Sequence, residues 1–147
     1  MNEIIYQSLM SFFACVCFSV VFQVKGKHIF FAGFGGLISW LIYLLAATPF
    51  PDSDIPRYFI ATVIITIYSE ICARVLRSPV TVFLAISLLP LVPGNGIYQT
   101  MVYCIKGDSV MALRQCIFTV GIAGALAIGI VVVSSIVQLI LRYNHMK

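Results

Sequence analysis

The chain has 147 residues, of which 61% are hydrophobic and only 10% are charged. A soluble domain carries roughly 25% charged residues, so this composition excludes a soluble protein and indicates an all-α, multi-pass integral membrane protein. The net charge of +4 does not indicate a nucleic-acid partner, because the basic residues cluster between apolar segments and no aromatic–basic patch accompanies them. We expect a single transmembrane domain over residues 1–147.

The first apolar segment, residues 4–24, predicts a membrane-spanning helix that the protein retains. Glu3 stands where a signal peptide would be basic, and no small-x-small cleavage site follows the segment. A second span is expected over residues 29–48, and each segment is close to the ~20 residues that cross a bilayer.

Proline residues mark the ends of the later segments. The loop 49–56 contains three prolines, and at the next break Ser78 is predicted to cap a helix with Pro79 in its first turn. The remaining expected spans are, in order, residues 57–74, 79–90 continued by 97–105 after a break, and 115–141.

The basic residues predict the orientation of the chain. They concentrate in the first and third loops, so we expect these loops to be cytoplasmic and the N-terminus to lie outside. Residues 79–105 could form one kinked crossing or a re-entrant hairpin, and six basic residues lie inside and three outside in both cases. The 27 residues reach about 40 Å at ~1.5 Å per residue, so we expect one kinked crossing, five spans and a cytoplasmic C-terminus.

Residues 88–100, LLPLVPGNGIYQT, place helix-breaking residues within an apolar segment. Pro90 and Pro93 have no N–H, so in a helix they would leave the carbonyls of Ile86 and Leu89 without donors. Backbone of this kind is tolerated inside a membrane only where it is buried in protein or lines a wet cavity. The segment therefore predicts a broken helix within the fourth span.

The second half of this break predicts a substrate site. Gly94 and Gly96 are expected to permit a sharp turn, and Asn95 to cap the helix that follows. The first N–H groups of that helix suit an anion, while the freed carbonyls suit an ammonium group, as a zwitterionic amino acid or a small carboxylate requires. The alternative is a proline kink that only shapes packing. The expected substrate-binding residues are Pro93, Gly94, Asn95, Gly96, Tyr98 and Gln99.

Glu70, Arg74 and Arg77 are spaced to share one face of the third helix, at i, i+4 and i+7. Glu70 lies about 10 Å deeper than Arg77, and a lone charge at membrane depth costs at least ~2.5 kcal/mol. One interpretation is an ion pair that reduces this cost. The other is a proton-coupling carboxylate at the inner mouth of a transport pathway.

Enzyme and metal chemistry have no candidates. No Ser-His-Asp set or metal-ligand cluster occurs, so we expect no enzyme activity, no cofactor and no metal. His28 and His145 are expected to be solvated at cytoplasmic helix ends. The cysteines are expected to be small buried apolar residues; they are Cys15, Cys17, Cys72, Cys104 and Cys116.

Small residues recur every fourth position in the last span, at Gly121, Ala125 and Gly129. The second span has Ala32 and Gly36 at the same spacing. Such stripes allow membrane helices to approach closely. They suit packing within the chain and packing between copies of it equally well, so a homo-oligomer stays open.

The run SEICARVLRSPVTVFLAISLLPLVPGNGIYQTM, residues 69–101, resembles the threonine/serine exporter family, and in particular the small membrane subunit that forms the C-terminal half of such exporters. The resemblance rests on the acidic-then-basic end of the third span, on PVTVF at 79–83, and on PLVPG at 90–94 with Tyr98 four residues later. The turn 106–108 followed by a Gly/Ala-rich span also fits.

The resemblance implies the small subunit of a secondary exporter in the inner or plasma membrane. Family members export threonine and serine, and a split form is associated with succinate. The implied partner is a larger subunit with a membrane part and a cytoplasmic domain, and the implied driving force is the proton gradient. A scaffold that stabilises a partner transporter, or a channel, are the alternatives.

Overall fold

The computed structural model describes residues 2–51 and 53–145, and in these ranges it contains only helices. The elements in chain order are α1 (Asn2–Val21), α2 (Lys27–Leu45), α3 (Asp54–Val75), α4 (Val80–Leu88), the short 3-10 helix η1 (Leu89–Leu91), α5 (Gly94–Ile105) and α6 (Ser109–His145). The all-α prediction is confirmed.

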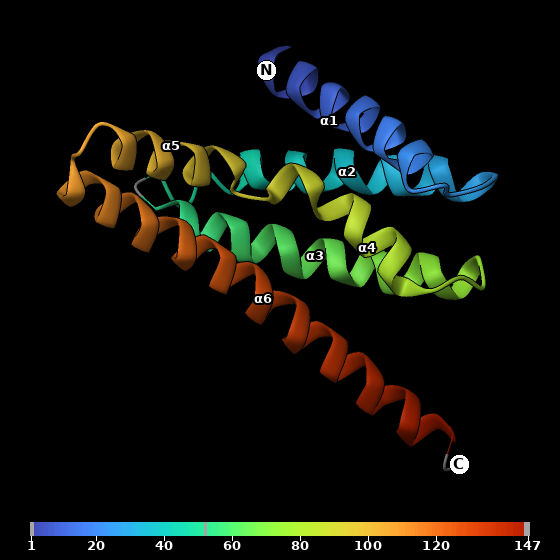
Figure 1. Cartoon of the computed structure of the whole chain (residues 1–147). Coiled ribbons are helices and arrows are strands. Elements are labelled where there is room, and N and C mark those ends of the chain that lie inside the picture. Colours follow the sequence, from blue (N-terminus) through green and yellow to red (C-terminus); the bar gives the residue numbers. More distant parts are fainter. Residues whose placement is uncertain (1, 52, 146–147) are drawn as a thin grey trace.

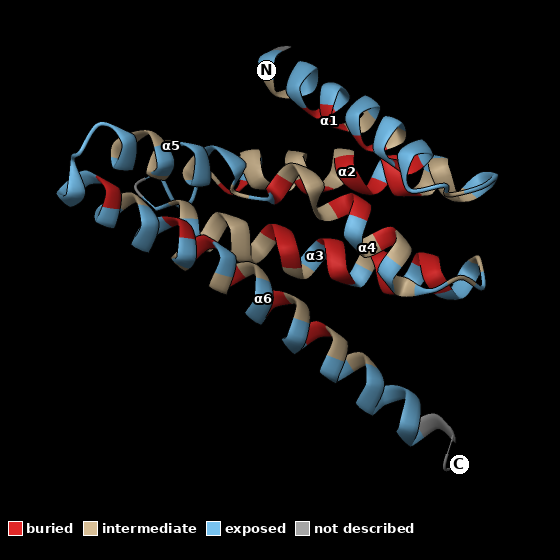
Figure 2. Cartoon of the chain, viewed as in Figure 1, coloured by how far each residue is buried: buried red, intermediate tan, exposed pale blue. Residues whose placement is uncertain are grey.

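The helices run back and forth along one axis (Figure 1). The α1–α2 and α3–α4 connections lie at one end of the molecule, while the α2–α3 and α5–α6 connections lie at the other (Figure 1). Helix α2 packs against α1, α3 and α4, and α6 packs along α3 and α5. The core therefore lies where α2, α3 and α4 meet, as the buried segments in Figure 2 show.

Four of the described helices, α1, α2, α3 and α6, are long and apolar enough to cross a membrane, and α4–η1 with α5 forms a fifth, bent candidate. The bend between the two parts is 51°. A re-entrant hairpin would reverse the chain, whereas α5 continues toward the end of the molecule opposite the α3–α4 connection (Figure 1). This course is the one expected of a broken span, so the described helices of this multi-pass membrane protein provide up to five candidate crossings.

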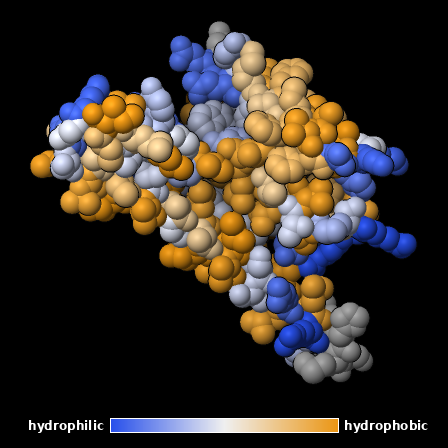
Figure 3. Space-filling view, viewed as in Figure 1, coloured by the Kyte–Doolittle hydropathy of each residue, from blue (hydrophilic) through white to orange (hydrophobic). Residues whose placement is uncertain are grey.

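The distribution of polarity agrees with this arrangement. Apolar side chains cover the middle of the molecule, and hydrophilic side chains gather toward its extremities (Figure 3). The α6 helix returns toward the end that carries the α1–α2 and α3–α4 connections, so the C-terminal part of α6, which contains Arg142, lies on the side of these two connections (Figure 1). Lys147, which the six-to-three count also uses, lies outside the described residues.

Three helices end in the same way. Gln23, Arg77 and Gly107 have positive φ angles of 56°, 50° and 75°, and each closes a Schellman motif after its helix. Arg77 has therefore left α3, and the prediction that it shares a helix face with Glu70 and Arg74 is wrong. The predicted cap is also wrong, because α4 begins at Val80 after Pro79, with no cap bond from Ser78.

Glycines set the distances between helices. A Cβ on Gly36 would meet the Cys15 side chain, and one on Gly35 would meet Ser87, so these glycines allow α2 to approach α1 and α4 closely. In α6, a Cβ on Gly129 would lie 3.1 Å from Thr62. The small residues predicted to pack within or between chains thus pack within this chain, where Ala125 is also buried.

Candidate functional site: a broken span beside a cavity

The break in the fourth span is made by Pro93. Its φ of −76° and ψ of 56° form an inverse γ-turn, closed by the Gly94 N–H donating to the Val92 carbonyl at 2.7 Å. Gly94 begins α5 at once, and neither Gly94 nor Gly96 has a positive φ. The expectation that glycines make the turn is therefore wrong, because the proline ring already fixes the required φ.

Asn95 is not the cap of α5. It is the second residue of the helix, whose N-cap position is Pro93, and no side chain caps this end. The first helical bond is donated by the Ile97 N–H to the Pro93 carbonyl at 3.2 Å. The N–H groups left free are thus those of Asn95 and Gly96, one step earlier than the sequence predicts.

The carbonyls predicted to be free are occupied. The Ile86 carbonyl accepts the Leu89 N–H and also the Cys15 thiol, whose Sγ lies 3.4 Å away. The Leu89 carbonyl accepts the Val92 N–H at 3.3 Å. At the break, no backbone N–H of the described residues donates to the carbonyl of Pro90 or Leu91, since the Gly94 N–H turns to Val92 and the Ile97 N–H to Pro93.

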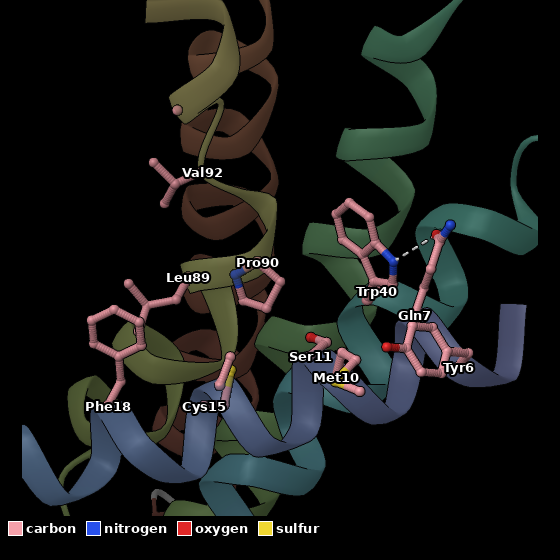
Figure 4. Close-up of a pocket in the computed structure, with 12 residues that line it drawn as sticks. Tyr6, Gln7, Met10, Ser11, Cys15, Phe18, Trp40, Leu89, Pro90 and Val92 are labelled. Atoms are coloured by element: carbon pink, nitrogen blue, oxygen red, sulfur yellow. Dashed lines mark hydrogen bonds between the residues drawn. The ribbon is translucent and has the colours of Figure 1, made fainter. Parts of the chain in front are cut away.

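A cavity of about 630 Å³ lies against this break (Figure 4). Helix α1 forms its floor, Trp40 of α2 lies at one side, and the chain from Leu89 to Gly94 forms the opposite side (Figure 4). Its lining residues are Tyr6, Gln7, Met10, Ser11, Ala14, Cys15, Phe18, Trp40, Leu89, Pro90, Val92 and Gly94.

The polar groups of the cavity come mainly from one face of α1. Gln7 accepts a hydrogen bond from the Trp40 indole at 3.4 Å, and the Ser11 hydroxyl donates to the Gly36 carbonyl at 2.8 Å. With Cys15 they repeat every four residues, and this spacing was the signal in the sequence that could have identified them. Sequence reasoning missed Gln7, Ser11 and Trp40 because each is unremarkable alone.

Of the six predicted substrate residues, only Gly94 is among those that line the cavity. Gly96 packs tightly on α6, where an added Cβ would meet the Thr119 side chain. Tyr98 is 64% exposed and lies away from the core. Pro93 shapes the turn, while Asn95 and Gln99 lie on α5 outside the cavity.

Glu70 and Arg74 form the predicted ion pair. Glu70 Oε2 lies 3.1 Å from Arg74 Nη2, with the glutamate side chain 12% exposed and the arginine 45% exposed. The cavity has no charged lining residue, so this pair is outside it. The neighbouring Ser69 hydroxyl is buried with no hydrogen-bond partner among the described residues.

His28 is not solvated, contrary to expectation. Its Nε2 lies 3.3 Å from the Ser78 hydroxyl, and its ring packs edge-on against Phe83 at a centroid distance of 5.8 Å. It joins the start of α2 to the α3–α4 connection because the Schellman turn at Arg77 brings Ser78 to it. The side chain of His145 lies outside the described residues.

The cysteines divide into two groups. Cys15 and Cys72 are buried as expected, whereas Cys17, Cys104 and Cys116 are exposed on apolar helix faces, where the expectation of burial is wrong. In a membrane protein lipid covers such faces, so a small apolar side chain is stable there without protein contact. No cluster of metal ligands occurs within residues 2–51 and 53–145.

A polar network connects the cavity to the α2–α3 connection. Trp40 packs on Tyr43 with ring centroids 5.1 Å apart, and the Tyr43 hydroxyl donates to Asp54 at 3.5 Å. Asp54 pairs with Arg57 at 2.8 Å, and Arg57 also donates to the Phe50 carbonyl. Arg57 thereby holds the α2–α3 connection against α3. Its partner Asp54 contacts Tyr43, which packs on the cavity residue Trp40.

Comparison with known protein families finds a match. The sequence profile of the family described as threonine/serine exporter, ThrE, matches residues 7–136. No curated protein and no solved structure matches the chain. The matched range covers the broken span, most of α6 and every lining residue of the cavity except Tyr6.

Proposed function

Because this chain belongs to the threonine/serine exporter family, we propose that it is a subunit of a secondary exporter of small amino acids or carboxylates, either threonine and serine or succinate. The observation that carries the proposal is the broken fourth span beside a cavity of about 630 Å³. Pockets that hold small molecules have volumes of roughly 300–1,000 Å³. The proposed exporter domain is residues 1–147, with no enzyme activity.

The break supplies the chemistry for substrate binding. Carbonyls without donors at Pro90 and Leu91 can accept from an ammonium group, and the free N–H groups of Asn95 and Gly96 can donate to a carboxylate. Gly94 lies between them on the cavity wall. In this proposal Pro93 fixes the turn beside the substrate. Tyr98 and Gln99 lie on α5 outside the cavity, and they would contact the substrate only after a movement of α5.

We further propose a larger partner subunit with a membrane part and a cytoplasmic domain, in the inner or plasma membrane. The support is the resemblance of residues 69–101 to the C-terminal half of two-part exporters. Export driven by the proton gradient would give Glu70 the role of a titrating carboxylate, with Arg74 as its partner and Arg77 at the cytoplasmic edge.

A non-transporting scaffold is the second candidate, because one specific observation favours it. Five of the six predicted substrate residues lie outside the cavity, and Glu70 is already paired. A scaffold would tolerate changes at Gly94, where an added Cβ meets no protein atom within 4 Å. A channel would conduct substrate without a proton gradient.

The deciding experiment is efflux of labelled threonine, serine and succinate from vesicles. The vesicles carry this chain, the larger subunit or both, with and without a pH gradient. We expect gradient-dependent efflux only when both chains are present. If vesicles with the larger subunit alone show the same efflux as vesicles with both chains, this chain does not transport and the scaffold function is favoured. Efflux that does not depend on the pH gradient would indicate a channel.

A further inference from the structure

We propose that α6, together with the ends of α3 and α5 that pack beside it, binds one anionic phospholipid, with the lipid phosphate at Arg114 and an acyl chain along Gly124. The site lies at the end of the molecule that carries the α2–α3 and α5–α6 connections (Figure 1). It shares no lining residue with the cavity beside the broken span, and it does not depend on the proposed transport function.

Two open grooves join along α6 to form this site. The first, of about 640 Å³, lies where the start of α3, the end of α5 and the start of α6 meet, and Arg114 is the charged residue among those that line it. The second, of about 400 Å³, lies between Phe59 of α3 and Gly124 of α6, and all of its lining residues are apolar. Ile55 and Gly121 line both grooves, so the two are continuous.

The polar end of the site has unused hydrogen-bonding groups. Within residues 2–51 and 53–145, the Arg114 guanidinium has no ion pair, and neither the Tyr103 hydroxyl nor the Gln115 amide makes a hydrogen bond. Arg57 of α3, by contrast, is paired with Asp54 at 2.8 Å. A guanidinium binds phosphate through parallel N–H donors, so Arg114 has the chemistry to hold a lipid phosphate.

The position of Arg114 along α6 matches the depth of lipid headgroups. Arg114 directly precedes the apolar span 115–141, and arginines near the ends of spans reach the membrane interface. The helix rises about 21 Å from Arg114 to Ile128 at ~1.5 Å per residue, while half of a hydrocarbon core is about 15 Å thick. The site therefore extends through one leaflet, from its headgroups to the middle of the bilayer.

The missing side chain of Gly124 makes room for the acyl chain. An added Cβ on Gly124 would meet no protein atom within 4 Å, which leaves a trough beside Phe59. Ile128, at the inner end of this trough, is 58% exposed and thus faces lipid. A surface without hydrogen-bonding side chains suits an acyl chain, since lipid tails are as apolar as the side chains that line it.

The single charge selects the class of headgroup. One guanidinium balances one phosphodiester, and none of the residues that line the groove is a carboxylate that could balance the ammonium of a zwitterionic lipid. Phosphatidylglycerol carries one negative charge, and its headgroup hydroxyls can bond to Tyr103 and Gln115. We therefore expect phosphatidylglycerol to bind more tightly than phosphatidylcholine.

Native mass spectrometry of the full chain in detergent measures this preference. Delipidated protein is titrated with dioleoyl phosphatidylglycerol or dioleoyl phosphatidylcholine, and the fraction that carries one lipid is followed. We expect the first phosphatidylglycerol to bind at least about fivefold more tightly, the effect of one arginine on an anionic lipid. Glycerol phosphate, which has the headgroup charge but no acyl chain, should not displace it.

Two arginine substitutions provide the matched comparison, because Arg114 and Arg142 lie near opposite ends of α6 and carry the same charge. Arg114→Gln should lower the affinity for phosphatidylglycerol about fivefold and remove the preference, whereas Arg142→Gln should change neither. Arg114→Lys keeps the charge and should retain part of the preference, which tests the site even if Arg114→Gln does not fold. Gly124→Leu fills the trough and should weaken the binding of both lipids.

Three results overturn the inference: equal affinities for the two lipids, equal losses in Arg114→Gln and Arg142→Gln, or unchanged lipid binding in Gly124→Leu. Displacement of the lipid by glycerol phosphate also overturns it and would make the site one for free anions. Because none of these measurements involves efflux, failure of the lipid site leaves the proposed transport function intact.

Discussion

Cys15 and Pro90 lie on different helices, and the thiol compensates for the proline. Pro90 has no N–H for the Ile86 carbonyl, and the Cys15 thiol donates to that oxygen at 3.4 Å. A free cysteine is usually a small apolar residue, but its weak S–H donor gives α1 a specific contact with the broken span.

We expect Cys15→Ala to lower the free energy of unfolding by about 1 kcal/mol, because a buried hydrogen bond to a carbonyl is lost. Cys15→Ser should recover part of this loss, since its hydroxyl can donate to the same oxygen. Thermal unfolding in detergent measures both. Cys17→Ala is the control, because Cys17 lies on the same helix but is exposed. An equal loss of unfolding free energy in this variant would contradict the role of Cys15.

Glu70→Gln separates coupling from structure. Its partner Arg74 is 45% exposed, and pairs near a surface contribute roughly 0.2–1 kcal/mol, so little stability should be lost. If Glu70 titrates during transport, the variant should keep efflux but lose most of its dependence on pH, measured in the vesicles described above.

Asp54→Asn is the control for this change, because Asp54 is the other carboxylate in an ion pair with the next-turn arginine. It should leave the pH profile of efflux unchanged. An unaltered profile in Glu70→Gln as well would make Glu70 a structural residue.

Helix α2 depends on glycine for its central position. Gly36 accommodates the Cys15 side chain, and its own carbonyl accepts the Ser11 hydroxyl, so close approach and hydrogen bonding occur at one place. Van der Waals packing between small residues drives helix association where lipid removes the hydrophobic effect between helices. Any Cβ at this position must separate α1 from α2.

We expect Gly36→Ala to destabilise the protein by about 1–3 kcal/mol through overpacking. Gly124→Ala should be neutral or stabilising, because its Cβ meets nothing and alanine favours the helix over glycine by about 1 kcal/mol. The midpoint of thermal unfolding in detergent distinguishes the two. A lower midpoint for both variants would contradict the prediction. It would mean that another molecule packs against α6 at Gly124, where this chain has no atom within 4 Å of an added Cβ.

The broken span requires both of its prolines. In a Pro90→Ala, Pro93→Ala variant the restored N–H groups can donate to Ile86 and Leu89, so α4 can continue toward α5. We expect the 51° bend to decrease and efflux to fall at least about tenfold, while insertion persists. Spin-label distances between α4 and α5 report the bend. Pro56→Ala, in the first turn of α3, is the control and should change neither quantity.

We propose that the chain crosses the membrane five times, which places the start of α1 and the end of α6 on opposite sides. This follows from a bend of 51° where a hairpin would need a reversal, and from α6 returning along α3. The positive-inside rule alone could not choose, because the two topologies place the same number of basic residues inside.

Cysteine accessibility tests this topology. On a cysteine-free background, Ser109→Cys and Thr48→Cys should react with a membrane-impermeant maleimide added outside intact cells, since the α5–α6 and α2–α3 connections share one end of the molecule (Figure 1). Lys25→Cys should react only after the membrane is opened. Labelling of Ser109→Cys from the inside alone would mean that residues 79–105 do not cross.

The sequence by itself determined the features that depend on composition and local chemistry. Apolar runs near ~20 residues predict spans whatever their neighbours, and prolines without N–H groups predict a break wherever they stand. The small-residue stripe in α6, the Glu70–Arg74 pair and the break between Pro90 and Gly94 all follow from such rules.

The tertiary structure decided which groups meet. The second donor to the Ile86 carbonyl comes from Cys15, 71 positions away, and the wall opposite the break comes from Gln7 and Trp40. Helix ends were also decided by backbone hydrogen bonds, which took Arg77 off its expected face. Contacts between distant segments depend on the packing of whole helices, and no local pattern encodes which helix faces which.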